Sequence, residues 1–137
     1  MSKFYDIDLP FGVKYEGTLS ELLTAETNKL IEVKTERDIW KKTGNIYVEF
    51  IWRETFSGIV TTEADWWATV LTLDGAIQGI IILPTEIMRN KVKRLIKEGK
   101  AQYPVSGGDD DASQGALVPI KELMNYEQET EAIHEES

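Results

Sequence analysis

The segment from Ile46 to Trp52 constrains the fold of this chain more than any other segment. Apolar residues at positions 46, 48 and 50 alternate there with the residues at positions 47, 49 and 51, and this period of two is typical of a β-strand. The turn-forming residues Thr43-Gly44-Asn45 come directly before it. We expect its hairpin partner to be Leu30–Lys34, a short run rich in branched apolar residues.

Further segments carry patterns of their own. Apolar residues recur at helical spacing from Tyr15 to Ala25, which predicts a first helix. A threonine with an acid three residues later resembles a capping box and predicts that a short helix starts in Thr61–Trp67. The β-branched residues at 69–73 lead into Asp74-Gly75, which predicts a strand and a tight turn. Ile77–Leu83 is expected to return as a buried strand.

The clearest helix is predicted to start at Pro84, to run to about Lys97 and to end at Gly99. Its inner side carries the apolar residues Ile87, Val92, Leu95 and Ile96. Its outer side carries a basic set, made of Arg89, Lys91, Lys93, Arg94, Lys97 and, past its end, Lys100. This set is either a track for phosphate groups or the ordinary solvated side of a helix. Residues 104–115 are predicted to form a loop, and residues 116–124 a last packed element.

The length of 137 residues fits a single domain, which we place at residues 1–124, followed by an acidic and disordered tail at residues 125–137. Residues 1–108 contain 14 Lys and Arg against 15 Asp and Glu, whereas residues 109–137 contain one Lys against nine acids. The net charge of −9 is therefore concentrated near the C-terminal end. A nearly neutral body leaves room for a local basic face that binds phosphate.

The cysteine and histidine counts limit the chemistry. The chain has no cysteine and one histidine, His134, near its end. Disulfides, thiolate zinc sites and a cysteine nucleophile are therefore excluded, and a hydrolytic site must use carboxylates, hydroxyls or lysine. No signal peptide opens the sequence and no apolar run is long enough to cross a bilayer, so we expect a cytoplasmic protein without membrane contact.

Glu32 and Lys34 are the first candidates for a site, because alternation along a strand places both side chains on one face, roughly 6 to 7 Å apart at the backbone. The carboxylate suits a hard divalent cation such as Mg²⁺, and the ammonium suits an attacking water and a charged phosphate. A second carboxylate is needed, for which Glu16 on the first helix is preferred to Glu21. The alternative is a solvated ion pair on a strand.

Several segments of the sequence share a longer pattern: residues 31–36 (Ile-Glu-Val-Lys-Thr-Glu), Trp40, residues 43–49 (Thr-Gly-Asn-Ile-Tyr-Val-Glu), Ser57-Gly58 and residues 61–67 (Thr-Thr-Glu-Ala-Asp-Trp-Trp). Together they resemble a group of short nuclease-like proteins, many carried by bacteriophages, in the PD-(D/E)XK superfamily. The resemblance covers about residues 11 to 84. Glu32 and Lys34 match the third motif of that superfamily, and the segment from Phe11 to Glu16 resembles the one that brings a helix glutamate.

The resemblance implies an α/β (α+β) fold with an αβββαβ restriction-endonuclease-like core, in which helices flank a mixed central sheet. It also implies a phage-encoded enzyme of the host cytoplasm that hydrolyses DNA phosphodiester bonds with Mg²⁺, which Mn²⁺ can replace. The sequence departs at the second motif, since no strand aspartate precedes Glu32. Glu26 and Glu49 are the alternatives for that ligand, and a third is that Glu16 itself fills the role.

Two groups of residues are candidates for contact with DNA. Trp40, Lys41, Lys42 and Asn45 lie in the segment that joins the first two predicted strands, where cations and an aromatic ring suit a nucleic acid. Thr62, Asp65 and Trp66 match the region of the superfamily that contacts the scissile backbone. Core packing is the main alternative for Trp66 and Trp67, and an ordinary loop is the alternative for the first group.

Three functions compete at this stage. The first is a Mg²⁺-dependent deoxyribonuclease, in which Glu16 and Glu32 bind metal and Lys34 acts beside the attacking water. The second is a nuclease-fold protein that lacks a complete metal site and acts as a DNA-binding or regulatory module. In the third, the acidic tail mimics DNA or recruits a protein partner. A homodimer is expected by analogy with nucleases that cut both strands.

Overall fold

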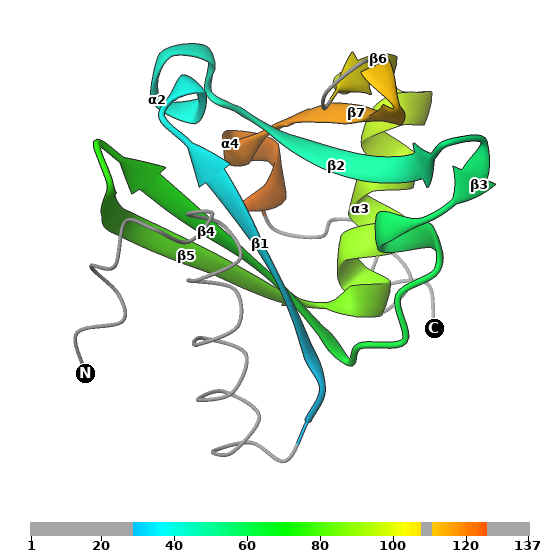
Figure 1. Ribbon diagram of the computed structural model, residues 1–137, viewed down its shortest axis with the longest axis horizontal. Helices are drawn as coiled ribbons and strands as arrows, with labels where there is room; N and C mark the ends of the chain where they lie inside the picture. The colour runs from blue at the N-terminus through cyan, green and yellow to red at the C-terminus, as the bar shows by residue number, and fades with distance from the viewer. Residues whose placement is uncertain (1–28, 108–110, 126–137) are drawn as a thin grey trace, which may run out of the picture.

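The computed structural model describes residues 29–107 and 111–125 (Figure 1). In chain order its elements are β1 (Ile31–Arg37), α2 (Ile39–Thr43), β2 (Asn45–Trp52), β3 (Thr55–Phe56), the 3-10 helix η2 (Gly58–Val60), β4 (Trp66–Leu73), β5 (Ala76–Pro84), α3 (Thr85–Lys97), β6 (Gln102–Gly107), β7 (Ser113–Pro119) and α4 (Ile120–Leu123). The helix predicted at residues 15–25 and the acidic tail beyond Asn125 lie outside the described residues. No helix in the described ranges is both long and apolar enough to span a membrane.

The described strands form two sheets. In the first sheet, β1 runs parallel to β4, and β4 pairs with β5 in the antiparallel sense. The second sheet has the order β3-β2-β7-β6 and is antiparallel throughout. The expectation of a mixed fold of helices and strands is confirmed. The expected single central sheet is replaced by two sheets in this part of the chain.

The predicted hairpin between Leu30–Lys34 and Ile46–Trp52 is wrong, although both segments are strands. β2 pairs with β7, and β1 pairs with β4, so that Glu32 lies beside Trp67 and Lys34 beside Thr69. Ile31 and Val33 of β1 are buried against Ala68 and Val70 of β4. The pairing of β1 with β4 therefore buries apolar residues that lie far apart in the sequence. A local sequence pattern does not show which strand provides the partner.

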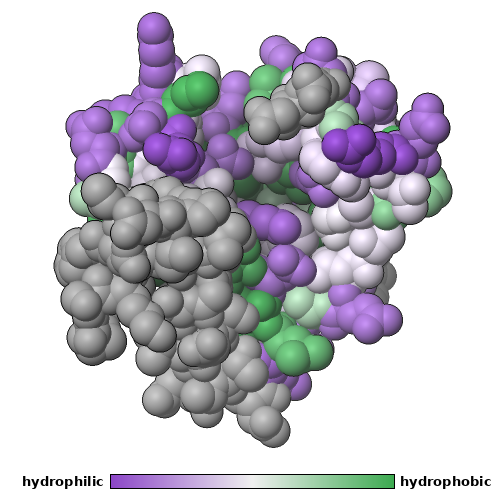
Figure 2. All heavy atoms as spheres, viewed as in Figure 1, coloured by the Kyte–Doolittle hydropathy of each residue, from purple (hydrophilic) through white to green (hydrophobic). Residues whose placement is uncertain are grey.

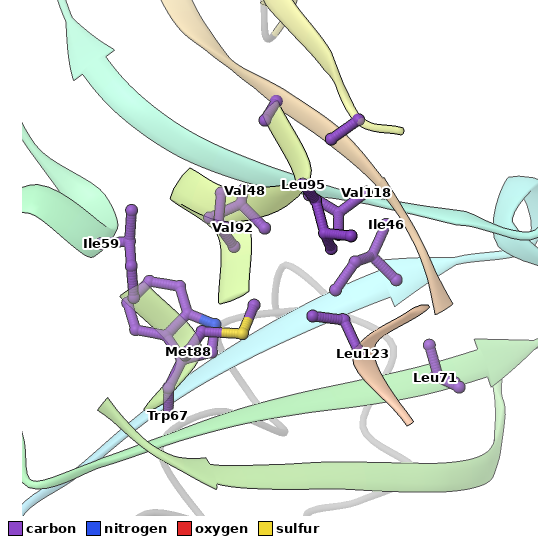
Figure 3. Close-up of a cluster of buried hydrophobic side chains, with 12 residues drawn as sticks. Ile46, Val48, Ile59, Trp67, Leu71, Met88, Val92, Leu95, Val118 and Leu123 are labelled. Atoms are coloured by element: carbon purple, nitrogen blue, oxygen red, sulfur yellow. The ribbon is translucent and has the colours of Figure 1, made fainter. Parts of the chain in front are cut away.

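The main core lies between the two sheets and α3 (Figure 3). Ile46 and Val48 of β2, Trp67 of β4, and Val92 and Leu95 of α3 are each at most 3% exposed. Because residues 46 and 48 face this core, the alternating side chains of Tyr47 and Glu49 point out of it. The alternation predicted for this strand is confirmed, and it decides which side chains are available for a site.

The helix predicted to start in Thr61–Trp67 is wrong. Residues 61–65 are irregular, and Trp66 starts β4. The hydroxyl of Thr62 accepts a hydrogen bond from the N–H of Ala64 at 3.2 Å, a turn contact two residues along the chain in place of a helix cap three residues along. Trp67 is buried in the core and its neighbours on β4 are β-branched, so burial and strand propensity together outweigh the capping signal.

β5 and β6 differ from their predictions. β5 exists as the edge strand of its sheet, but the prediction that it is buried is wrong, since Ile77, Ile80 and Ile82 are 41%, 40% and 38% exposed. β6 occupies part of the segment predicted as a loop. Its Pro104 is tolerated because β6 is also an edge strand, where a missing N–H costs little.

α3 confirms the predicted helix of residues 85–97, and Gly99 follows in a left-handed conformation with φ of 76°. Its inner side is made by Met88, Val92 and Leu95. The prediction that Lys91 lies on the outer side is wrong: its side chain is 3% exposed, and its Nζ donates to the carbonyl of Asn125 at 2.8 Å. The basic face of α3 is therefore narrower than its sequence indicates.

Candidate functional site

Glu32 and Lys34 form an ion pair on β1. Oε2 of Glu32 lies 3.4 Å from Nζ of Lys34, and the two side chains are 37% and 41% exposed. They share one face of β1 because Ile31 and Val33 bury the opposite face. The sequence prediction that strand alternation would bring these two side chains together agrees with this geometry.

A loop fixes the other oxygen of Glu32. The hydroxyl of Thr62 donates to Oε1 of Glu32 at 3.2 Å. The carboxylate of Asp65 accepts a hydrogen bond from the N–H of Leu30 at 3.1 Å, and the N–H of Asp65 donates to the carbonyl of Leu30 at 2.8 Å. Asp65 thus ties the loop to the start of β1, while Thr62 orients the carboxylate.

Two hollows flank the ion pair. The larger, of about 440 Å³, is lined by Leu30, Ile31, Glu32 and residues 61–64. The smaller, of about 160 Å³, is lined by Lys34, Thr35, Glu36, Tyr47, Glu49 and Trp67, and Nζ of Lys34 lies 5.9 Å from the centre of the Trp67 ring. Figure 2 shows hydrophilic side chains near the middle of the face that is drawn, beside β1 as Figure 1 places it.

Glu36 is a residue of this region that sequence reasoning missed. It lies on the same face of β1 as Glu32 and Lys34, and its Oε1 accepts a hydrogen bond from the backbone N–H of Tyr47 at 2.8 Å. Burial raises the pKa of its carboxyl to about 7, and the hydrogen bond from Tyr47 offsets part of that shift. The spacing Glu-x-Lys-x-Glu was the available signal, since all three side chains fall on one strand face.

Glu49 faces the smaller hollow and is held by hydroxyl groups. Ser113 donates to its Oε1 at 2.9 Å and Ser57 donates to its Oε2 at 3.0 Å. The hydroxyls of Ser113 and Tyr47 lie 2.7 Å apart. Burial raises the pKa of Tyr47, the hydrogen bond to Ser113 lowers it, and the charge of Glu49 raises it further. Glu49 therefore shares the hollow of Lys34 and lies outside the set that lines the hollow of Glu32.

Two oxygen donors of the kind that divalent metals bind lie at this site, and among the described residues they do not make a complete ligand set. Glu32 supplies a partly exposed carboxylate and Thr62 a hydroxyl at the edge of the larger hollow, and hard cations such as Mg²⁺ prefer oxygen ligands. Among residues 29–107 and 111–125, no group of three or more acids or histidines is placed to hold a metal. The other predicted ligands, Glu16 and Glu26, and the less favoured Glu21, lie outside the described residues.

The residues predicted to contact DNA have mixed surroundings. Trp40 packs against the core, and its Nε1 donates to the carbonyl of Thr72 at 2.6 Å, and Trp66 packs against the Ile31 cluster. Both rings thus have structural contacts. Lys41 and Lys42, the basic residues in the last turn of α2, are exposed, and Asn45 starts β2 beside them. Lys41 and Lys42 are the two cations in the connection between β1 and β2.

Comparisons with known proteins add no family to this description. The chain matches no protein-family model, no curated protein and no solved structure.

Proposed function

We propose that this protein is a metal-dependent nuclease that hydrolyses DNA phosphodiester bonds at Glu32 and Lys34. The observation that carries the proposal is the placement of a partly exposed carboxylate and ammonium, 3.4 Å apart, between two hollows. In this role Glu32 is a metal ligand. Lys34 is the cation that orients the attacking water and offsets charge on the phosphate.

The surroundings of the pair favour a site over a solvated ion pair. An exposed pair on a sheet usually has water on all sides and contributes little to stability. Here Thr62 holds one oxygen of Glu32, and the hollow beside Lys34 is lined by two further carboxylates and a buried indole. Side chains held in fixed positions beside a hollow are what a reaction centre requires.

Mg²⁺, or Mn²⁺ in its place, would supply Lewis-acid stabilisation of the phosphate and would lower the pKa of a bound water. Glu32 would hold it together with Glu16, while Glu26 remains the alternative. The chain's own groups have separate tasks. Thr62 orients Glu32, Lys34 binds the phosphate, and the exposed Lys41 and Lys42 draw DNA toward the site.

We infer that the sheet of β1, β4 and β5 corresponds to the catalytic sheet of a restriction-endonuclease-like core. It is mixed, it carries the Glu-x-Lys strand, and the long helix α3 follows it directly. The proposal extends to a phage-encoded enzyme of DNA processing or repair that acts as a homodimer.

Metal titration tests this proposal. We expect calorimetry with Mn²⁺ to show binding to the wild-type protein and binding at least roughly tenfold weaker to Glu32→Gln, because a neutral amide is a poor ligand for a hard cation. Glu54→Gln, in the exposed turn between β2 and β3, is the matched control and should bind as wild type. Equal affinity in all three proteins would remove Glu32 from the metal site.

One observation favours a second function. No group of three ligating side chains exists within the described ranges, so a DNA-binding module without a complete metal site is the alternative. A module would bind a DNA duplex equally well with EDTA or with Mn²⁺ and would cut none. The nuclease is expected to cut with Mn²⁺ and to stop in EDTA.

A further inference from the structure

The carboxyl group of Glu36 lies in the smaller hollow, beside Lys34 and Glu49. Only its Oε1 has a hydrogen bond among the described residues, from the N–H of Tyr47 at 2.8 Å. The group is largely removed from water, and its pKa is raised to about 7 as a result. Burial of an ionisable group destabilises its ionised form, and such groups concentrate at functional sites.

The neighbours of Glu36 decide what the group can do. Lys34 lies two residues away on the same face of β1, and Glu49 and Tyr47 face the hollow from β2. β4 contributes the uncharged Trp67 to the lining. α2, which also packs against β1, carries the exposed Lys41 and Lys42. Lys34 is thus the one cation among the residues that line the hollow.

Glu36 and Glu49 differ in how their oxygens are used. Both oxygens of Glu49 accept hydrogen bonds from serine hydroxyls. Glu36 has one backbone donor and a desolvated environment. Glu36 is therefore the carboxyl of this hollow that is placed to exchange a proton near neutral pH.

We propose that Glu36 is a proton acceptor of the site and takes the proton of the attacking water from the hollow that it shares with Lys34. This inference rests on the proposed nuclease function. It adds a group that the Glu-x-Lys motif does not contain, and it assigns a proton acceptor, which the proposed roles of Glu32 and Lys34 do not include.

The step balances in atoms and charge. The water oxygen forms a bond to phosphorus, and its proton passes to the ionised Glu36 carboxylate. The bond between phosphorus and the leaving nucleotide oxygen breaks, and that oxygen takes a proton from solvent water. Glu36 then releases its proton to solvent, which restores the ionised form before the next turnover. No oxidant, reductant or further reactant is needed.

The pH dependence of cleavage by the metal-loaded protein tests the inference. Wild type is expected to lose kcat/KM below an apparent pKa near 7, since the acceptor must be ionised. Glu36→Gln keeps an oxygen for the N–H of Tyr47 but accepts no proton. It should lower kcat about a hundredfold and leave KM within about twofold. It should also remove the acidic limb of the pH profile, which is the fall of kcat/KM below pH 7. Glu36→Asp should keep the limb and part of the rate.

A second measurement does not depend on activity. In protein labelled with ¹³C at the glutamate carboxyls, the resonance absent from Glu36→Gln is expected to titrate near pH 7. A midpoint near that of an ordinary glutamate would overturn the inference, because Glu36 would then not be desolvated in the hollow.

The outcomes separate the two proposals. If wild type cleaves DNA and Glu36→Gln cleaves at the same rate with the same pH profile, the inference on Glu36 fails and the nuclease stands. If wild type cleaves no DNA with either metal, both proposals fail. If Glu36→Gln loses rate and keeps the acidic limb, Glu36 only supports the fold of β1 against β2, and the inference fails.

Discussion

The hydroxyl of Thr62 donates a hydrogen bond to Oε1 of Glu32 at 3.2 Å, across 30 residues of sequence. Lys34 holds the other oxygen of the same carboxylate at 3.4 Å. Glu32 is thus oriented from its own strand and from the loop before β4. Groups that orient a candidate ligand in this way commonly tune its affinity, and this arrangement gives the first prediction.

Thr62→Val is expected to reduce metal-dependent cleavage by about 10-fold to 100-fold, since it removes the hydroxyl while keeping the shape of the side chain. Thr62→Ser keeps the donor and should stay within about threefold of wild type. Steady-state kcat/KM on a defined DNA duplex measures the effect, and thermal unfolding checks that the fold is intact. Wild-type activity in Thr62→Val would show that Glu32 needs no orientation from the loop.

Gly115 gives a second prediction, on the packing of β7 against β2. A Cβ at this position would lie too close to the carbonyl oxygen of Val48 and 2.9 Å from the Tyr47 ring. Gly115→Ala should lower the free energy of unfolding by about 1 to 3 kcal/mol, as overpacking does. Gly79→Ala on β5 is the control, because a Cβ there meets no atom within 4 Å.

Urea unfolding of the two glycine variants measures this difference. The expected result is a large loss of stability in Gly115→Ala and a change within about 0.5 kcal/mol in Gly79→Ala. Tyr47 is hydrogen-bonded to Ser113, and Ser113 donates to Glu49. Because a methyl group at Gly115 would displace the Tyr47 ring, Gly115→Ala should also reduce cleavage. Equal stability of the two variants would mean that β2 and β7 leave room for a methyl group at Gly115.

The sequence determined the elements of this fold better than their arrangement. The strands around Glu32 and Val48 and the helix after Pro84 were recognisable because local periodicity reports which face is buried. The partner of β1 was not, since the match between Val33 and Ala68 depends on residues 35 positions apart. Lys91 shows the same limit, because its burial depends on the carbonyl of Asn125.

The candidate site was predicted in part. Strand alternation was enough to place Glu32 beside Lys34. The contact between Thr62 and Glu32 depends on the folded position of the loop before β4. The sequence around Thr62 resembles a helix cap, whereas in the structure its hydroxyl donates to Glu32 and accepts from Ala64. The environment of Glu36 was beyond local patterns, because the burial that raises its pKa depends on how the two sheets meet.

Glu36 gives a third prediction, on the pH dependence of stability. In the unfolded chain its carboxyl loses its proton near the ordinary glutamate pKa of 4.5, whereas in the folded protein it keeps that proton up to about pH 7. Between these values the folded state binds more protons, so the free energy of unfolding falls as pH rises from 4.5 to 7 and is not regained above 7. At 1.36 kcal/mol per pKa unit, the loss approaches about 3 kcal/mol.

Glu36→Gln should remove this contribution. Urea unfolding at pH 5 and pH 8 is expected to show a smaller fall in stability for Glu36→Gln than for wild type, by up to about 3 kcal/mol. The exposed Glu54→Gln should behave as wild type. If wild type and Glu36→Gln lose the same stability between the two pH values, the Glu36 carboxyl is not desolvated in solution.

The central claim is that Glu32 and Lys34 form the reaction centre of a nuclease, and it is tested most directly by cleavage of DNA. The assay compares wild type, Glu32→Gln, Lys34→Ala and the control Glu54→Gln on supercoiled, linear duplex and single-stranded DNA with Mg²⁺ or Mn²⁺. The account predicts cleavage by wild type and control and a loss of at least roughly a hundredfold in both site variants, with folding unchanged. Wild-type cleavage rates in Glu32→Gln or Lys34→Ala would contradict it.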